Sequence, residues 1–336
     1  MTTPLLTICV ANFQGQEVIT RCLESVFDQR CDFSYEVLVH DDASTDESRK
    51  IVTRGFPAAR LIIADDNLGF CISNNRMAKA ARGEFLLLLN NDTRLHPGSL
   101  QTLVDAARAD LQSGIWSLPQ YSMHSGELLD RGMDIDLFAN PIPVKLPRPE
   151  VAMVMGSCLL LRRSLWDELG GFPEWFGSIA EDMYLCHRVR LRGLKIRVTN
   201  SGGYDHEVGH SFGGGKVLGN RLASSYRRRQ LSELNKSRVI VTCFPGALPW
   251  MILLFHFPLL LLEGIVMSVS ERSLKPLRTV YLPSLCGILR DVPRLRRERL
   301  RCMQRRCISL LEFLQPIRLT HHKLTMLLRH GLPSLS

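Results

Sequence analysis

The first third of the chain alternates short apolar runs with segments of helix length. The runs lie at Leu5–Ala11, Tyr35–His40, Arg60–Ala64, Glu84–Leu89 and Ile115–Leu118. This alternation is typical of βαβ units and predicts an α/β fold with a mainly parallel sheet and flanking helices. The leucines at 86–89 follow one another without a polar residue, which predicts a strand buried on both faces.

Polar residues begin where two of these strands end. Asn90, Asn91 and Asp92 follow the leucine run, and Asp41 and Asp42 end the second strand. Open α/β sheets bind ligands at this edge. Asp and Asn oxygens suit Mg²⁺ or Mn²⁺ with phosphate oxygens completing the shell, and a carboxylate can accept a hydrogen bond from a nucleobase or ribose. Polar turns and helix-capping acids explain the same residues equally simply.

Local signals predict where other elements begin and end. Ser44–Glu47 fits a capping box, with Ser44 bonding forward and Glu47 reaching back, and Pro97 suits a first helical turn. Val151–Leu161 is predicted to be a strand, and Ser164–Leu169 a short helix closed by two glycines. The stretch Gln120–Glu150 contains four prolines near its end and is predicted to be irregular.

Two further segments hold candidate chemistry. Glu181 and Asp182 open an apolar-periodic segment, so a helix N-terminus would keep either carboxylate ionised, as a general base requires and as an ordinary first-turn acid also allows. Tyr204–Lys216 contains His206, His210 and three consecutive glycines, which suit a loop that closes over a ligand. A surface histidine without a ligand is the simpler alternative.

Several classes of protein are disfavoured by what the sequence lacks. It has no GxGxxG or P-loop pattern, which argues against a dinucleotide oxidoreductase and a P-loop kinase. Its ten cysteines form no CxxC pair, and several lie in apolar runs, so a reducing cytosol is expected. The N-terminal stretch has no basic region, and its apolar run is too short for a signal peptide.

Five blocks of the first 215 or so residues resemble the family 2 glycosyltransferases with the GT-A fold, most closely the rhamnosyltransferase-like branch that elongates bacterial surface glycans. The blocks keep the family order: VANFQGQEVITRCLESV, EVLVHDDASTDES, NLGFCISNNRMAKAARGEFLLLLNNDT, MGSCLLLRRSLWDELGGFPEWFGSIAEDMYLCHRVRLRG and HEVGHS. The resemblance implies a GT-A domain over residues 1–236.

The resemblance also implies roles at the donor site. Asp41 is similar to the aspartate that hydrogen-bonds the pyrimidine of a nucleotide-diphospho-sugar, and Asp46 to the second acid of that motif. Asn90-Asn91-Asp92 stands in the place of the DxD motif and leaves Asp92 as the metal ligand, with His206 resembling the later histidine that contacts the metal or the diphosphate. The implied donor contacts are Asn12, Asp41, Asp46, Asn75, Asn91 and Asp92, and the implied cofactor is Mg²⁺ or Mn²⁺.

On the acceptor side, Asp182 resembles the general base that deprotonates the acceptor hydroxyl. Trp175 is placed to stack on an acceptor sugar, and Glu181 is an expected acceptor contact. The family often reads GGFDE and EDxDL where this chain has Pro173 and Tyr184. Neither position carries the base, but a phenol at 184 changes the hydrogen bonds available to a sugar.

The remaining residues, 237–336, are expected to form an apolar and basic helical region that associates with a membrane. Val239–Leu262 has no charged residue over 24 positions, enough to cross a bilayer, but its three prolines favour a broken, re-entrant or interfacial segment. A buried helical pair in a C-terminal subdomain is the alternative.

The excess of positive charge belongs to this region. From Arg272 to the end there are 14 Lys and Arg against three acids, whereas the rest of the chain carries 28 and 30. Eight arginines in Arg290–Arg306 surround apolar positions, a pattern typical of a helix on an anionic membrane surface. Nucleic acid is disfavoured as a partner, because Phe313 is the single aromatic after residue 290.

The sequence therefore predicts an inverting, metal-dependent glycosyltransferase that uses a nucleotide-diphospho-sugar, with dTDP-rhamnose the first candidate donor. The expected acceptor is a lipid-linked glycan at the cytoplasmic face of a bacterial inner membrane, where the tail lies peripherally or as a re-entrant segment. The alternative hypothesis is a membrane-associated scaffold that keeps the nucleotide-sugar fold without catalysis. Asp41, Asp92 and Asp182 occur together, which argues against the scaffold.

Overall fold

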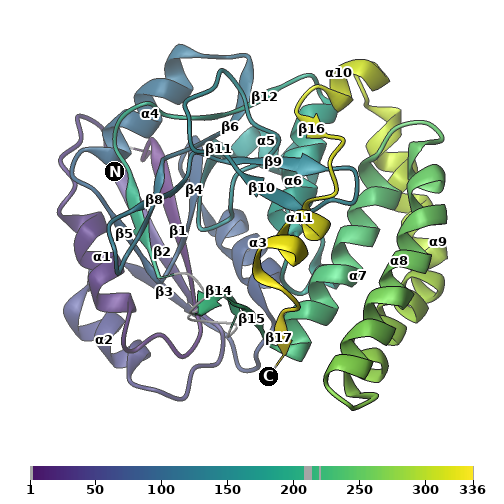
Figure 1. The fold of residues 1–336 in the computed structure, drawn as a ribbon. Coiled ribbons are helices and arrows are strands. Elements are labelled where there is room, and N and C mark those ends of the chain that lie inside the picture. The colour runs from purple at the N-terminus through teal and green to yellow at the C-terminus, as the bar shows by residue number, and fades with distance from the viewer. Residues whose placement is uncertain (1–2, 208–213, 219–220, 336) are drawn as a thin grey trace. The chain divides into compact units, whose positions relative to one another are not determined.

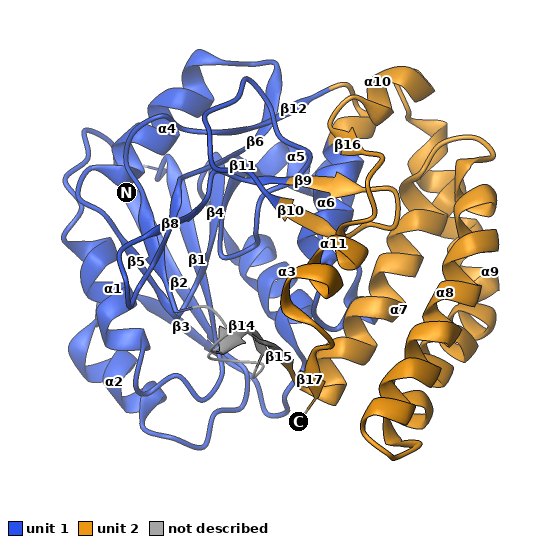
Figure 2. Cartoon of the chain, in the orientation of Figure 1, with its two compact units in different colours: residues 1–133, 143–189, 194–207 blue, residues 134–142, 190–193, 208–336 orange. Residues whose placement is uncertain are grey.

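The protein forms two compact units in a computed structural model that describes residues 3–207, 214–218 and 221–335. Unit 1 comprises residues up to 133, 143–189 and 194–207, and unit 2 comprises 134–142, 190–193 and 208 onward (Figure 2). The expected boundary between 236 and 237 is crossed by the continuous helix α7 (Tyr226–Cys243), because the chain has no proline or glycine between Tyr226 and Pro245. The helical unit therefore begins earlier than predicted.

A seven-stranded sheet forms the centre of unit 1 (Figure 1). Its strand order is β12-β6-β11-β4-β1-β2-β3, and β11 alone among them pairs antiparallel with its neighbours. The bounds are β1 (Leu6–Asn12), β2 (Tyr35–Asp41), β3 (Arg60–Ile63), β4 (Phe85–Asn90), β6 (Ser113–Ser117), β11 (Cys158–Arg162) and β12 (Lys195–Val198). The predicted mainly parallel α/β sheet is confirmed.

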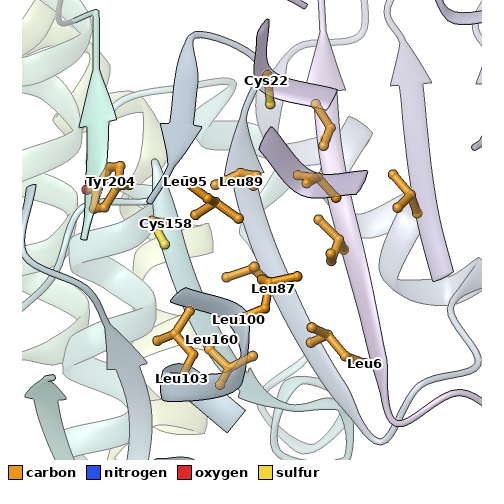
Figure 3. Packing of buried hydrophobic residues seen from close by; sticks show 14 of the residues in the cluster. Leu6, Cys22, Leu87, Leu89, Leu95, Leu100, Leu103, Cys158, Leu160 and Tyr204 are labelled. Carbon is orange, nitrogen blue, oxygen red and sulfur yellow. The ribbon is translucent and has the colours of Figure 1, made fainter. Parts of the chain in front are cut away.

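Apolar side chains from one face of this sheet pack against two helices (Figure 3). Alternate strand residues such as Leu6, Leu87 and Leu160 meet Leu100 and Leu103 of α4, as a strand period of two requires. The two helices that cover this face are α1 (Ile19–Phe27) and α4 (Ser99–Ala109). The other helices up to residue 191 are α2 (Ser48–Gly55), α3 (Phe70–Ala80), α5 (Arg163–Leu169), the 3₁₀ turn η1 (Glu174–Phe176) and α6 (Glu181–Leu191).

Several local predictions were wrong. The strand predicted at Val151–Leu161 begins only at Cys158, after Gly156, and the helix predicted from Pro97 begins at Ser99. The stretch 120–150 contains short strands: β7 (Gln120–Ser122), β8 (Leu128–Asp130), β9 (Met133–Asp136) and β10 (Pro141–Pro143). Strands β7 and β8 join β5 (Thr93–Leu95) and β13 (Tyr204–His206) in a sheet of order β5-β13-β7-β8.

Unit 2 is built around a group of helices. They are α7, α8 (Leu248–Ser270), the π-helical turn η2 (Leu277–Tyr281), α9 (Leu282–Gln304), α10 (Leu310–Leu314) and α11 (His322–His330), with short strands β14 (Gly214–Leu218), β15 (Arg221–Ser224), β16 (Ile317–Arg318) and β17 (Ser334–Leu335). The apolar run 239–262 is divided between α7 and α8 by a turn at Pro245, as its prolines indicated. Within the described residues, α8 is the one helix whose length and composition would suffice to cross a membrane.

Candidate functional site

The site lies at the carboxyl ends of three neighbouring parallel strands. In the register of the sheet, Asn12 at the end of β1 stands opposite Asp41 at the end of β2, and Ala11 stands opposite Asn90 at the end of β4. Asn91 and Asp92 follow directly and are 6% and 3% exposed. The predicted juxtaposition of these side chains at one sheet edge is therefore present.

Asn12 links Asp41 to Asn91 through its side-chain amide. Its Nδ2 donates to Oδ2 of Asp41 and to Oγ of Ser48, both at 3.0 Å, and its Oδ1 accepts from Nδ2 of Asn91 at 2.8 Å. The side chain is 2% exposed. Each of these hydrogen bonds is between buried groups, so they fix Asp41 and Asn91 relative to one another.

Asp41 is held in its ionised form. Its Oδ1 accepts hydrogen bonds from the Ser44 backbone N–H at 3.0 Å and from Nε of Arg49 at 2.5 Å. Burial alone would raise the pKa of this carboxyl, but the hydrogen bonds from Ser44, Arg49 and Asn12 outweigh it and lower the pKa below its usual range. The site therefore keeps a fixed negative charge at the end of β2.

Residues 44–47 do not form the predicted capping box. Helix α2 begins at Ser48, and the Ser44 hydroxyl accepts a hydrogen bond from the backbone N–H of Gln14. Asp46 stabilises the start of α2 instead. Its Oδ1 accepts a hydrogen bond from the backbone N–H of Ser48 at 3.1 Å, and its Oδ2 accepts one from the backbone N–H of Gln16 at 2.9 Å. The structure thus shows Asp46 joining the loop after β1 to the start of α2.

Asp42, which the sequence pattern did not distinguish from Asp41, orders the neighbouring turn. Its two oxygens accept from the backbone N–H groups of Leu68 and Gly69, both at 2.8 Å. Gly69 has a φ of +89°, which favours glycine, and the next residue begins α3. The sequence signal for this contact was present in the second acid of the strand end and in the Asn-Leu-Gly turn, but nothing in the sequence paired them.

Asp92 and His206 form the expected pair. Oδ1 of Asp92 lies 3.2 Å from Nε2 of His206, and the Glu207 backbone N–H donates to the Asp92 carbonyl at 3.0 Å. His206 reaches this position because β13 pairs with β5, which follows Asp92 directly. Sequence reasoning also named His210, which lies outside the described residues.

This pair has the chemistry of a partial metal site. Nδ1 of His206 is buried and has no hydrogen-bond partner among the described residues, and Oδ1 of Asp92, also buried, faces Nε2 of His206 at 3.2 Å without forming a hydrogen bond of good geometry. A carboxylate oxygen and an imidazole nitrogen are ligands that Mn²⁺ accepts, and a carboxylate suits Mg²⁺. The described residues contain no cluster of three or more His, Cys, Asp or Glu side chains able to hold a metal. The two side chains therefore fit a cation whose remaining ligands come from phosphate and water.

Glu181 and Asp182 open α6, as predicted, and are 6% and 8% exposed. The two residues before them, Ile179 and Ala180, have φ values of +72° and +68°, a conformation that costs free energy in residues with a Cβ. Oδ2 of Asp182 accepts a hydrogen bond from the Gly156 N–H at 3.0 Å. A strained turn and a backbone hydrogen bond thus set the direction of this carboxylate.

Asp182 is connected to Asn90, at the end of β4, through two backbone groups. Gly156 binds Asp182, and the carbonyl of the next residue, Ser157, accepts from the Asn90 N–H at 3.0 Å. Ser157 is itself fixed, because its hydroxyl lies 2.8 Å from the Tyr204 hydroxyl. The carboxylate that could act as a base therefore lies close to the end of β4.

Of the remaining expected contacts, Asn75 lies on α3 and Trp175 lies on the segment that leads to α6. Asn75 uses its amide to hold this segment: Oδ1 accepts from the Phe172 N–H and Nδ2 donates to the Phe172 carbonyl, both at 3.0 Å. Trp175 lies in the 3₁₀ turn η1, with its ring edge-on to Phe176 at 4.7 Å between centroids. The structure thus places Asn75 as a support for the segment that carries Trp175.

The fold belongs to the GT-A class. Among solved structures, GalNAc-T7 with UDP, GalNAc and Mn²⁺ superimposes with a TM-score of 0.61 at 13% identity, covering 99% of this chain and 59% of that one. The mannosyltransferase PcManGT from Pyrobaculum calidifontis, in complex with GDP-Man and Mn²⁺, gives 0.51 at 16% identity, covering 87% and 88%. At these identities the likeness establishes the fold.

Residues 7–170 match the model of the glycosyl transferase family 2, so the chain carries a domain of that family, as the sequence predicted. An N-acetylglucosaminyl-diphospho-decaprenol L-rhamnosyltransferase of Mycobacterium tuberculosis is 29% identical over 53% of this chain and 68% of its own length. A chondroitin synthase of Escherichia coli is 26% identical over 54% of this chain and 26% of its own. An uncharacterized protein of M. tuberculosis, MT1568, is 35% identical over 30% of this chain and 31% of its own length. The match to this chain thus spans about a third or less of the length of MT1568 and of the chondroitin synthase.

Proposed function

We propose that the protein is an inverting, metal-dependent glycosyltransferase of bacterial surface polysaccharide synthesis. It moves a sugar from a nucleotide-diphospho-sugar to a hydroxyl of a lipid-linked glycan at the cytoplasmic face of the inner membrane. Rhamnose from dTDP-rhamnose is the first candidate donor. The name of the M. tuberculosis relative, a rhamnosyltransferase with a diphospho-decaprenol acceptor, supports both the sugar and the lipid-linked acceptor.

The observation that carries this proposal is the linked set of polar side chains at the sheet edge. Asn12 joins Asp41 to Asn91, Asp92 lies against His206, and Asp182 is tied to the end of β4 through residues 156–157. A fold that served only as a scaffold has no need of a buried carboxylate oxygen and a buried imidazole nitrogen that lack good hydrogen bonds, whereas a site for a cation and a diphosphate does.

In this proposal Asp41 accepts a hydrogen bond from the pyrimidine, with Asn12 and Arg49 fixing its direction. Asn91 and Asp46 contact the donor or shape the loops around it. Asp92 and His206 hold Mg²⁺ or Mn²⁺, which supplies positive charge to the leaving diphosphate. The two neighbouring structures named with Mn²⁺ support this choice of metal.

Asp182 takes the proton from the acceptor hydroxyl, which is a weak nucleophile until it is deprotonated. Trp175 stacks on the acceptor sugar and Glu181 hydrogen-bonds it. Attack occurs on the face opposite the leaving group and gives inversion, since a single base is assigned and no carboxylate nucleophile is needed. Asn75, which the sequence predicted as a donor contact, has its amide engaged with Phe172 and Glu174, so in this proposal it supports the segment at 172–174.

The test is calorimetric titration of UDP and dTDP into the purified protein with Mn²⁺, with Mg²⁺ and with EDTA. We expect metal-dependent binding that Asp41→Ala and Asp92→Ala weaken by roughly tenfold or more, because each removes a charged contact. Asp182→Asn should leave nucleotide binding unchanged and abolish sugar transfer. No binding of either nucleotide would contradict the proposal and favour the scaffold, whereas turnover by Asp182→Asn would overturn the assignment of Asp182 as the base.

A further inference from the structure

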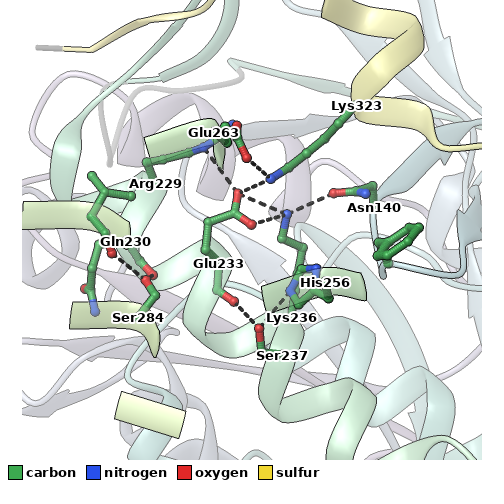
Figure 4. Close-up of polar contacts among 12 residues, drawn as sticks. Asn140, Arg229, Gln230, Glu233, Lys236, Ser237, His256, Glu263, Ser284 and Lys323 are labelled. Atoms are coloured by element: carbon green, nitrogen blue, oxygen red, sulfur yellow. Dashed lines mark hydrogen bonds and ion pairs between the residues drawn. The ribbon is translucent and has the colours of Figure 1, made fainter. Parts of the chain in front are cut away.

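Helix α8 directs His256, Glu263 and Ser268 toward the interior of unit 2. Its single charged residue, Glu263, contacts Lys323 at 2.9 Å and also pairs with Arg229 of α7 (Figure 4). His256 is 4% exposed, and its Nε2 lies 3.0 Å from the Ser237 hydroxyl. The inner side of α8 therefore belongs to a buried polar network.

The outer side of α8 has the opposite character. It presents ten large apolar side chains that are between 39% and 72% exposed: Trp250, Met251, Leu254, Phe255, Leu259, Leu261, Leu262, Ile265, Val266 and Val269. They recur at the three- and four-residue spacing of one helix face and extend over the whole helix, about 35 Å at 1.5 Å per residue. We name these ten residues the outer face of α8.

A helix with polar atoms inside and apolar atoms outside is reversed with respect to a soluble protein. Exposed apolar patches of this extent mark binding surfaces, because water is a poor solvent for them. The inner face, with His256 and Glu263 engaged in hydrogen bonds and ion pairs, stays against α7 and α11. One face alone is thus available to a hydrocarbon phase, which fits a helix lying along a bilayer and not one crossing it.

The charge beside this face identifies the lipid. Arg299 of α9 donates to the carbonyls of Phe244 and Gly246, just before α8, and its guanidinium lies 5.9 Å from the Trp250 ring centroid. The second half of α9 therefore lies next to the start of α8. Helix α9 bears further arginines that are exposed, namely Arg290, Arg294, Arg296, Arg297 and Arg301.

We propose that the outer face of α8 inserts into the headgroup and acyl boundary of a membrane containing anionic lipid, with the α9 arginines contacting its headgroups. Trp250, at the arginine-flanked end, has the ring type that favours this boundary. A second copy of the chain is the weaker candidate, because a symmetric interface would bring together two basic surfaces without added negative charge. The inference names the surface behind the proposed membrane location and does not depend on the transfer reaction.

The experiment is flotation of the full chain with vesicles of phosphatidylcholine, alone or with phosphatidylglycerol, without donor or acceptor. We expect binding to the anionic vesicles. The variant Leu254→Ser/Phe255→Ser/Leu262→Ser should reduce partitioning by roughly tenfold or more, because it removes large apolar groups from the inserted face. The matched control, Ile63→Ser/Leu111→Ser/Leu146→Ser, replaces apolar residues of unit 1 that are 55%, 74% and 74% exposed, and should bind as the native protein does.

The contribution of charge is tested with Arg296→Gln/Arg297→Gln/Arg301→Gln, which should lose the preference for anionic vesicles. Circular dichroism and sedimentation equilibrium of every variant establish folding and oligomeric state. Equal partitioning of native protein and the α8 variant would overturn the proposal. So would a native protein that binds no vesicle and forms a dimer that the α8 variant dissociates. Because no sugar nucleotide is present, either result leaves the proposed transfer reaction to its own test.

Discussion

At the scale of the residue, polar side chains near the strand ends are committed to neighbours that are distant in sequence. Asn12 bonds to residues 29, 36 and 79 positions away, which places the ends of β1, β2 and β4 in one hydrogen-bonded group. Glu36 has the same function at the opposite end of β2. Its carboxylate accepts from the Thr7 hydroxyl at 2.8 Å and from the Arg82 backbone and side chain.

Glu36 gives the fold a specific dependence on pH. Burial raises the pKa of this carboxyl, but the hydrogen bonds from Arg82 and Thr7 are stronger and lower it below its ordinary value of 4.5. A lowered pKa in the folded state stabilises the fold above about pH 4.5, and this contribution is lost as the pH falls through the folded-state value. Glu36→Gln should lower the free energy of unfolding by about 1 kcal/mol at pH 7, since Arg82 is partly solvated.

The measurement is urea denaturation of the native protein and Glu36→Gln from pH 7 to pH 3. The difference in free energy of unfolding between the two proteins should shrink below pH 4.5. The stability of Arg82→Gln should depend on pH in the same direction as that of the native protein, but less strongly. A constant difference across this range would show that Glu36 acts through packing and not through its charge.

The residue types of the site could be predicted from the sequence, but several of their partners could not. Asp41, Asp92 and His206 were named from strand ends and the family resemblance, and they lie at one sheet edge. The pairing of Asp42 with the Leu68 and Gly69 amides depends on how two loops meet in space, which no local pattern encodes. For the same reason the engagement of Asn75 with Phe172 was not anticipated.

At the scale of the element, local sequence signals predicted some strands and helix ends and failed where a tertiary contact replaced the local one. The leucine run became a strand buried along its length, and the glycines after Leu169 end α5. The capping box at 44–47 failed because the Ser44 hydroxyl is engaged by Gln14, so a tertiary contact replaced the local one. The strand prediction failed for the early part of 151–161, because this part pairs through an isolated bridge, between Met153 and Met133, and not through a continuous ladder.

Two glycines at helix ends should respond oppositely to the same substitution. Gly170 follows α5 with a φ of +79°, and no atom lies within 4 Å of the position a Cβ would take. Gly170→Ala should therefore lower the free energy of unfolding by about 1 kcal/mol through backbone strain alone. Gly55, at the end of α2 and equally open, has no left-handed conformation, so Gly55→Ala should raise it by about 0.5 kcal/mol.

Thermal and urea denaturation of the two glycine variants provide the measurement, and each serves as the control for the other. Both alanines add one methyl group where there is room for it. Losses of equal size in the two variants would mean that crowding, and not the sign of φ, determines the cost.

At the scale of the whole molecule, the two units are stabilised by different means. Unit 1 has an apolar core between its sheet and the helices α1 and α4. Unit 2 has a smaller apolar cluster, at Leu260, Met267, Val280 and Tyr281, and a buried group of charges (Figure 4). The sequence indicated the basic and apolar character of this region, but not that ion pairs would lie inside it, because Glu233, Glu263 and Lys323 are far apart in the chain.

Glu233 is the centre of that group of charges. Its side chain is fully buried, with Lys323 at 2.8 Å and Lys236 and Arg229 at 3.2 Å. These three cations together overcome burial and hold the pKa of Glu233 well below its usual range. Removing the negative charge takes the ion pair from Lys236 and leaves Arg229 and Lys323 to their contacts with Glu263, in a largely buried region. The loss of one partner of a buried pair is strongly destabilising.

Glu233→Gln should therefore destabilise unit 2 by about 3 kcal/mol, whereas Glu47→Gln, which removes the exposed pair with Lys50, should cost less than about 0.5 kcal/mol. Because two cores need not unfold together, hydrogen exchange of peptides from α7 and β4 is a better measurement than a single melting curve. We expect faster exchange in α7 and little change in β4 for Glu233→Gln. If α7 kept its protection, the cations would have to be compensated by other acids, of which Glu263 is the nearest candidate through its contact with Lys323.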